Sequence, residues 1–210
     1  MSGRLQCVVH NALKYTTVQL VNKVDLLKVF CAVTMQVFAG SDVELVARNL
    51  FELSKASSID GIIAADGHVA LIWLLRAGAD SQTTHNAIGC LMLLSFQSTE
   101  RKLRLVQAGV VAPTVALLRT LPTASNQVAL AHAANLVAKL CMTSAGLEAF
   151  QTAGAIAPLV SLLGAASEIA MQAAGALRSL SFDPEAKKPV NHAEILEAGA
   201  IPPLVALLHG

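Results

Sequence analysis

Residues 153–163 read Ala-Gly-Ala-Ile-Ala-Pro-Leu-Val-Ser-Leu-Leu, and residues 198–208 repeat the phrase as Ala-Gly-Ala-Ile-Pro-Pro-Leu-Val-Ala-Leu-Leu. A third copy stands at 108–118, and a shorter one runs from residue 66 to residue 75. The glycines that we align in these copies are 42, 45 and 45 residues apart: Gly67, Gly109, Gly154 and Gly199. An apolar helical pattern that recurs at a fixed period of this length predicts a stacked array of helical repeats.

Each copy has the composition of a sharp turn between two helices. The glycine allows the backbone dihedrals that end one helix and lead into the next. A proline follows near the start of the second helix, where a missing N–H is tolerated: Pro113, Pro158, and Pro202 or Pro203. A further helix comes later in the repeat, as in Gln-Ala-Ala-Gly-Ala-Leu-Arg-Ser-Leu-Ser-Phe at 172–182 and Asn-Ala-Ile-Gly-Cys-Leu-Met-Leu-Leu-Ser-Phe at 86–96.

These two motifs resemble those of armadillo-repeat proteins. The resemblance implies an all-α fold in which three-helix repeats stack into a right-handed superhelical solenoid. It is closer to the generic repeats of catenin-like and vacuolar-scaffold-like arrays than to importin-α, because the repeated Trp and Asn of importin-α are missing and Trp73 falls on a second helix. Proteins of this fold bind many unrelated partners, so the resemblance says less about function than about the fold.

The aligned leucines of the third helices place the repeats. They recur at intervals of 40, 41, 46 and 40 residues: Leu13, Leu53, Leu94, Leu140 and Leu180. We therefore expect one array over residues 1–210, without separate domains. It consists of a partial unit at 4–14, units at about 17–54, 58–96, 99–142 and 145–182, and an incomplete unit at 186–210.

Two links between helices are longer than the others, at 119–126 and 182–191. In the second, Asp183 followed by Pro184 predicts a helix start. Both insertions are read either as tolerated surface loops or as loops recruited for binding. The sequence stops directly after an expected second helix, so we expect a fragment of a longer protein whose uncovered end offers a surface for end-to-end self-association.

Composition narrows the function classes. The chain has 54% apolar and 14% charged residues and a net charge of +1, which favours a sizeable core and gives no sign of a nucleic-acid partner. No run of eighteen apolar residues exists, so we expect no membrane insertion. Cys7, Cys31, Cys90 and Cys141 have no Cys-x-x-Cys spacing and are interpreted as core thiols. The default location is the cytoplasm, with the nucleus as alternative.

The search for chemistry finds no site. The sequence has no Gly-x-Ser-x-Gly, no P-loop, no His-Glu-x-x-His and no Gly-x-Gly-x-x-Gly motif. The six histidines are scattered, and none lies at metal-ligand spacing from another or from a cysteine. We therefore expect no enzyme, no cofactor and no metal site.

The armadillo resemblance instead implies a concave groove lined by the third helices. Its first row reads Glu52, Leu93, Lys139 and Ser179, and its second row reads Arg48, Gly89, Asn135 and Gly175. His85 is one turn further back, with Ala131 or His132 as its counterpart, and Arg178 adds a later charge. Together these define the predicted partner-binding residues: Arg48, Glu52, His85, Gly89, Leu93, Asn135, Lys139, Gly175, Arg178 and Ser179.

Two features of these rows have alternative explanations. Glycines inside helices cost about 1 kcal/mol each relative to alanine, so Gly89 and Gly175 indicate close approach of either a neighbouring repeat or a ligand. Arg48 and Glu52 are spaced to pair with each other or with a partner.

The leading function hypothesis is a non-enzymatic scaffold whose groove binds an extended or helical segment of another protein. The alternative is the substrate-recruiting part of a larger enzyme, such as a U-box ubiquitin ligase. A third is a structural role through self-association of the uncovered end.

Overall fold

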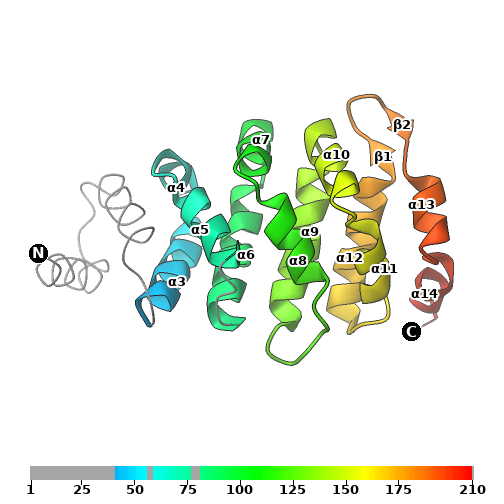
Figure 1. Cartoon of the computed structure of the whole chain (residues 1–210), viewed down its shortest axis with the longest axis horizontal. Coiled ribbons are helices and arrows are strands. Elements are labelled where there is room, and N and C mark those ends of the chain that lie inside the picture. The colour runs from blue at the N-terminus through cyan, green and yellow to red at the C-terminus, as the bar shows by residue number, and fades with distance from the viewer. Residues whose placement is uncertain (1–40, 56–58, 77–80, 210) are drawn as a thin grey trace, which may run out of the picture.

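The computed structural model describes residues 41–55, 59–76 and 81–209. The expected unit at 4–14, the first part of the unit at 17–54, and Cys7 and Cys31 lie outside these ranges. Among the described residues the chain is built almost entirely of helices, arranged along one long axis (Figure 1). The predicted all-α class is confirmed.

The helices follow one another in a short–short–long order. The described part of the array begins with the long helix α3 (Ser41–Lys55). Three complete triplets follow: α4 (Ile59–Ala64), α5 (Gly67–Arg76) and α6 (Ser81–Leu94); α7 (Thr99–Gln107), α8 (Val111–Leu118) and α9 (Gln127–Leu140); α10 (Ser144–Thr152), α11 (Ile156–Leu162) and α12 (Ser167–Leu180). Strands β1 (Phe182–Asp183) and β2 (Lys188–Pro189) come next, and helices α13 (His192–Glu197) and α14 (Ile201–Ala206) close the described chain.

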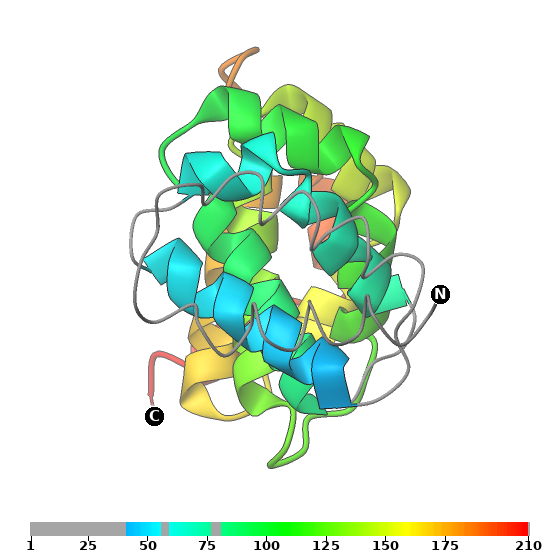
Figure 2. The same cartoon turned by 90° about the vertical axis from the view of Figure 1, so that its left-hand side faces the viewer.

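The long helices α3, α6, α9 and α12 pack against one another in sequence order, and the shorter helices cover them. Seen along the long axis, the equivalent helices of successive repeats lie behind one another (Figure 2). Buried alanines such as Ala87, Ala134 and Ala173 let the long helices approach closely. The aligned Leu94, Leu140 and Leu180 are fully buried, so the core runs through the array without interruption.

The turn between the first and second helices uses a left-handed residue. Gly109, Gly154 and Gly199 have φ values of 83°, 69° and 77°, which a residue with a β-carbon adopts at a cost. In the shortened copy the left-handed residue is Asp66, with φ 54°, and Gly67 is the first residue of α5. Our alignment of Gly67 with Gly109 was therefore wrong by one position, because Asp tolerates the left-handed region.

Two arginines join neighbouring repeats at equivalent places. Arg76, at the end of α5, donates from Nη2 to the carbonyl of Gly109 at 3.1 Å. Arg119, just after α8, donates from Nη2 to the carbonyl of Ala153 at 3.2 Å. Each cation thus satisfies a carbonyl just past the end of a first helix, where the helix dipole also favours positive charge.

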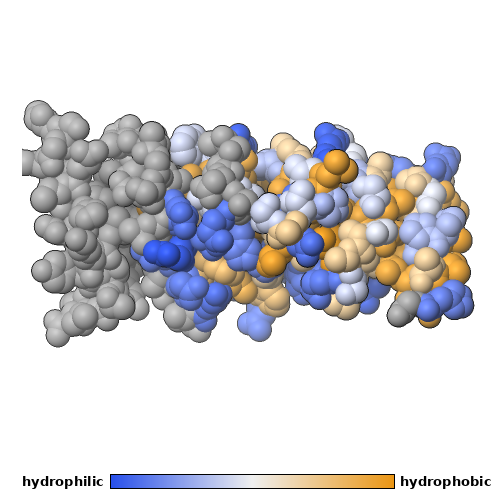
Figure 3. All heavy atoms as spheres, turned by 90° about the horizontal axis from the view of Figure 1, so that it is seen from below, coloured by the Kyte–Doolittle hydropathy of each residue, from blue (hydrophilic) through white to orange (hydrophobic). Residues whose placement is uncertain are grey.

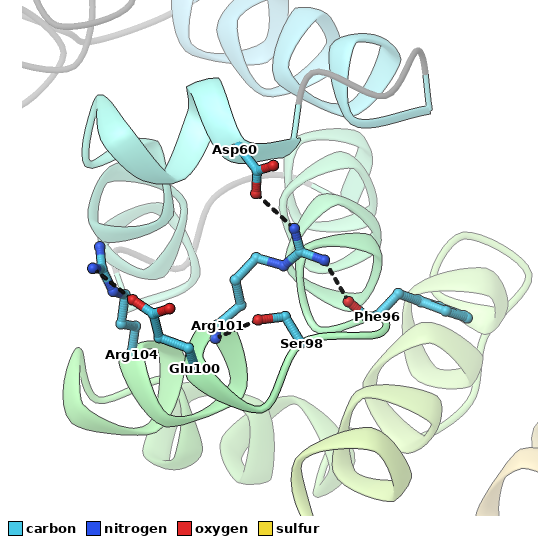
Figure 4. A network of polar contacts seen from close by, with 6 residues as sticks. All are labelled: Asp60, Phe96, Ser98, Glu100, Arg101 and Arg104. Carbon is cyan, nitrogen blue, oxygen red and sulfur yellow. Dashed lines mark hydrogen bonds and ion pairs between the residues drawn. The ribbon is translucent and has the colours of Figure 1, made fainter.

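A third arginine fixes the start of α7 (Figure 4). The Arg101 guanidinium pairs with Asp60 of α4 at 2.7 Å and donates to the carbonyl of Phe96 at 2.7 Å. The backbone N–H of Arg101 donates to the Ser98 hydroxyl at 3.2 Å, which makes Ser98 the N-cap of α7. The loop after α6 is therefore held by Arg101 of α7, and the same guanidinium ties this loop to α4.

Both insertions are ordered by local hydrogen bonds. The first is closed by Asn126, whose Oδ1 accepts from the backbone of Thr123 and whose Nδ2 donates to the carbonyl of Leu121. The second forms the β1–β2 hairpin, with Phe182 opposite Pro189. The Asp183 carboxylate accepts hydrogen bonds from the backbone of Ala186 and from the Ser144 hydroxyl, and these bonds lower its pKa.

The predicted helix start at Asp183-Pro184 was therefore wrong. Asp183 lies in β1, and the next helix begins only at His192. The physical reason is that the Asp183 side chain accepts hydrogen bonds from the backbone of Glu185 and Ala186 in the hairpin turn and from the Ser144 hydroxyl of α10, instead of capping a helix of its own.

On the face seen in Figure 3, apolar residues become more frequent towards the end of the chain that carries α14. Ile201, Val205 and Leu208 are 52%, 46% and 82% exposed, in contrast to the buried leucines of the complete repeats. No helix in the described ranges has the length and hydropathy needed to span a bilayer.

Candidate functional site

The ten predicted binding residues all lie on the long helices α3, α6, α9 and α12. We call the partly exposed side of these helices the third-helix face. Arg48, Glu52 and Arg178 are exposed, and Gly89 is buried. The other six are half-buried: His85, Leu93, Asn135, Lys139, Gly175 and Ser179.

One part of this face is a ring cluster that joins three repeats. The rings of His85 and His132 lie 5.2 Å apart between centroids, and Phe51 meets them edge-on or tilted at 5.7 and 6.1 Å. The Lys55 ammonium lies 4.1 Å from the centroid of the Phe51 ring. His132, and not the buried Ala131, is therefore the counterpart of His85.

The ring cluster keeps its histidines neutral. Burial lowers the pKa of His132 to about 4, with further contributions from the neighbouring His85 and Lys55. Burial, followed by repulsion from Lys55, also lowers the pKa of His85. His132 Nδ1 is enclosed and has no hydrogen-bond partner within the described chain. At neutral pH the rings of this cluster are therefore uncharged, and they form a largely apolar contact between repeats next to the Lys55 ammonium.

The ring cluster explains Gly89. A β-carbon at this position would come within 2.7 Å of Phe51 Cε2 and 2.9 Å of His132 Nδ1. Neighbour packing, one of our two explanations, therefore accounts for this glycine. Gly175 is the opposite case, because a β-carbon there would meet no atom within 4 Å.

A polar chain lies beside Gly175. Asn135 Nδ2 donates to Gln172 Oε1 at 2.8 Å, and Gln172 Nε2 donates to Glu168 at 2.9 Å. One turn on, the Ser179 hydroxyl donates to the carbonyl of Gly175 at 3.2 Å. The open space at Gly175 is thus bordered by hydrogen-bonding side chains from α9 and α12.

The charged residues pair differently from what their spacing predicts. Glu52 pairs with Lys55 at 2.9 Å, and no ion pair joins it to Arg48. Because both side chains are at least half-exposed, this pair contributes little to stability. Of the ion pairs within the described residues, none includes Arg48, Lys139 or Arg178. Lys139 instead lies 4.7 Å from the centroid of the Phe96 ring.

Sequence reasoning missed several residues that lie on or next to this face: Phe51, Lys55, Phe96 and Lys102. Phe51 precedes the predicted Glu52 by one position and resembles a core residue, which its 8% exposure supports. Its contact with His132 spans two repeats, and no linear motif marks such a pair. The one available signal was Gly89, whose cost inside a helix indicates that something bulky lies next to it.

The described residues contain no group of three or more His, Cys, Asp or Glu side chains that could hold a metal ion. The pair His85 and His132 thus has no third ligand of these types within those ranges. Cys90 and Cys141 are buried free thiols. Burial raises the pKa of both, that of Cys90 to about 12, so neither is a reactive thiolate at neutral pH.

The sequence matches no family model and no curated protein. It does match solved structures. A computationally designed armadillo repeat protein for modular peptide recognition superimposes with a TM-score of 0.74 at 19% identity, over 100% of this chain and 88% of that one. A designed armadillo repeat protein in complex with the peptide (KR)4 gives 0.68 at 24% identity, over 86% and 74%. An engineered protein gives 0.72 at 26% identity, over 88% and 74%.

These likenesses, together with the repeating helix triplets, define the class of fold. The chain has an all-α armadillo-repeat fold. The closer likeness to catenin-like and vacuolar-scaffold-like arrays than to importin-α stays a prediction from the sequence motifs.

Proposed function

We propose that this chain is a non-enzymatic protein-interaction scaffold and that it binds a partner segment along the groove lined by its third helices. Proteins of this fold commonly serve as binding scaffolds, and one of the similar designed structures holds a peptide. Because the two described cysteines are buried free thiols, we further propose a reducing location, the cytoplasm, with the nucleus as alternative.

The observation that carries the proposal is the open space at Gly175. Its backbone is uncovered on the third-helix face, where a β-carbon would meet nothing within 4 Å. Asn135, Gln172 and Ser179 place hydrogen-bonding groups around it. An extended segment could therefore approach the helix backbone closely and form hydrogen bonds there, as extended peptides do on other binding surfaces.

The test fills this space without disturbing the fold. A library of random peptides of about twelve residues is displayed and selected against the full chain, and enriched peptides are synthesised for fluorescence polarisation. Gly175→Leu places a side chain where the partner would lie. Gly164→Leu is the matched control, because Gly164 is exposed after α11 and a β-carbon there also meets nothing within 4 Å.

We expect Gly175→Leu to weaken peptide binding by about tenfold or more, which corresponds to about 1.4 kcal/mol, and Gly164→Leu to leave it unchanged. Far-UV circular dichroism must show that both variants stay folded. Equal affinities for both variants, or no enriched peptide at all, would contradict the proposed function.

A further inference from the structure

Two lysines lie together at the end of the third-helix face, next to two exposed apolar side chains. Phe96 follows α6, Lys102 belongs to α7, and Lys139 and Met142 stand at the end of α9 and just after it. We call these four residues the lysine–aromatic patch. The patch lies between two repeats, since α7 packs against both α6 and α9.

Lys102 is an unusual residue in this position. Its side chain is only 7% exposed, and the contact of its Nζ is the Met142 Sδ at 4.0 Å, a weak acceptor. Burial, and then repulsion from Lys139, lowers the pKa of Lys102. The Lys102 ammonium is partly buried, has no carboxylate partner and stands near a second positive charge, so this arrangement does not stabilise the free protein.

The second lysine is equally without a carboxylate. Lys139 Nζ lies over the Phe96 ring at 4.7 Å, a cation–π contact. Across the described part of the chain, the ion pairs involve neither Lys102 nor Lys139. The two positive charges thus stand near each other with no acidic side chain between them, and a negatively charged partner group would relieve their repulsion.

The apolar half of the patch is also uncovered. Phe96 is 37% exposed and Met142 is 56% exposed. Arg101 binds the Phe96 carbonyl, and the Phe96 ring points away from that network (Figure 4). The backbone of this residue is therefore anchored while its ring remains available beside Lys139.

The position of these apolar residues repeats along the array. Phe96, Met142 and Phe182 each come two residues after a fully buried leucine that ends a long helix, and Phe182 is 47% exposed. Packed helices lie about 8–10 Å apart, and an extended chain advances about 3.3 Å per residue. An extended segment that follows this edge would meet one such side chain every two to three residues.

We propose that the lysine–aromatic patch binds an acidic segment of a partner protein, with a carboxylate between Lys102 and Lys139 and large apolar side chains against Phe96 and Met142. This rests on the proposed function and specifies the chemistry of the partner. The two unpaired lysines favour an acidic partner by charge complementarity. The exposed Phe96 ring and Met142 thioether favour apolar side chains on either side of the acidic residue.

The proposal predicts opposite effects on binding and on stability. Lys102→Met keeps the apolar stem and removes the charge, so the free protein should become no less stable. Lys139→Gln removes the more accessible charge and leaves the core untouched. Arg104→Gln is the matched control, because Arg104 is an exposed cation on the same helix as Lys102, pairs with Glu100 and lies outside both the patch and the predicted binding residues.

The experiment compares the peptides that the display library yields on the wild-type chain with those on the three variants. Representative peptides are then measured by fluorescence polarisation at low and high salt. We expect enriched peptides to carry Asp or Glu next to Phe, Leu, Ile or Met. We expect a loss of about ten- to hundredfold in affinity with Lys102→Met or Lys139→Gln, no change with Arg104→Gln, and weaker binding in salt. The basic peptide (KR)4 should not compete.

The outcomes separate this inference from the proposed function. Peptides that lack acidic residues, or that bind the two patch variants as tightly as the wild type, overturn the inference and leave the scaffold function standing if Gly175→Leu still weakens them. If no peptide is enriched, or if Gly175→Leu has no effect, the scaffold function fails. Acidic peptides lost from both patch variants but not from Arg104→Gln confirm the patch itself.

Discussion

Gly89 lies against the ring of Phe51 so closely that a β-carbon on Gly89 would be 2.7 Å from Phe51 Cε2. The absent side chain is what allows α3, α6 and α9 to share the ring cluster of Phe51, His85 and His132. The equivalent glycine two repeats further on, Gly175 in α12, faces open space. One glycine is therefore explained by packing between repeats, and the other is free to serve a partner.

Alanine at these two positions should have opposite effects on stability. Gly175→Ala should raise the free energy of unfolding by up to about 1 kcal/mol, because alanine favours a helix and meets no neighbour. Gly89→Ala gains the same propensity but must displace Phe51 and His132, and overpacking of this kind costs about 1–3 kcal/mol. We expect a net loss of about 1 kcal/mol by urea unfolding. Stabilisation by both variants would show that the rings move freely.

Stability should depend on pH through the histidines. The folded chain holds the pKa of His132 at about 4, below the ordinary value near 6.5. Burial also lowers the pKa of His85 and that of His68, a buried residue of α5. The unfolded chain then binds more protons, so this part of the stability is complete above about pH 6.5 and is lost as the pH falls towards 4.

The measurement is a series of thermal melts between about pH 7 and pH 4. His132→Phe keeps a ring in the cluster and removes one titrating group, so its melting temperature should fall less steeply over that range. The dependence should not vanish, because His68 and His85 remain. An identical slope for wild type and variant would place His132 in an environment that does not change its pKa.

The left-handed glycines should differ in sensitivity according to their neighbours. Alanine at Gly109 or Gly199 must adopt a positive φ, which costs about 1–2 kcal/mol. At Gly109 the new β-carbon would also collide with Arg76 Nη2, whereas at Gly199 it meets nothing within 4 Å. Gly109→Ala should therefore destabilise the chain more than Gly199→Ala, by loss of the Arg76 contact. Arg76→Ala should abolish most of that difference.

In the Arg101 network, we expect the hydrogen bond to the Phe96 carbonyl to contribute more to stability than the ion pair with Asp60. Asp60 is almost fully exposed, so Asp60→Asn should cost less than about 1 kcal/mol and its effect should fade in high salt. Arg101→Met also removes the hydrogen bond to the Phe96 carbonyl, and we expect about 1–3 kcal/mol. Equal costs for the two variants in chemical unfolding would mean that the exposed ion pair is the stronger contact.

The sequence was sufficient for the fold because its signals are local. A glycine in the left-handed region and a proline in the next helical turn mark the same corner at Gly154 and Pro158, and the apolar spacing marks the helices. Errors arose where a residue other than glycine did the same task, as at Asp66, or where a side chain capped an unexpected turn, as at Asp183.

The candidate site was predictable only in part. Helical spacing was sufficient to put residues such as Asn135 and Lys139 on the third helices. It could not show that Phe51, His85 and His132 meet, because their contacts join three repeats and depend on the space that Gly89 leaves. Nor could it show Lys102 beside Lys139, since Lys102 belongs to a first helix and faces α9 only after the repeats stack.

The most direct test of the central claim is NMR mapping of a selected peptide on the isotope-labelled chain. The account predicts that chemical-shift changes gather on the third-helix face, at Leu93, Asn135 and Ser179, and are small on the second helices around Trp73, Ala116 and Ala157. Changes that gather instead on those second helices, with the third-helix face unaffected, would contradict it.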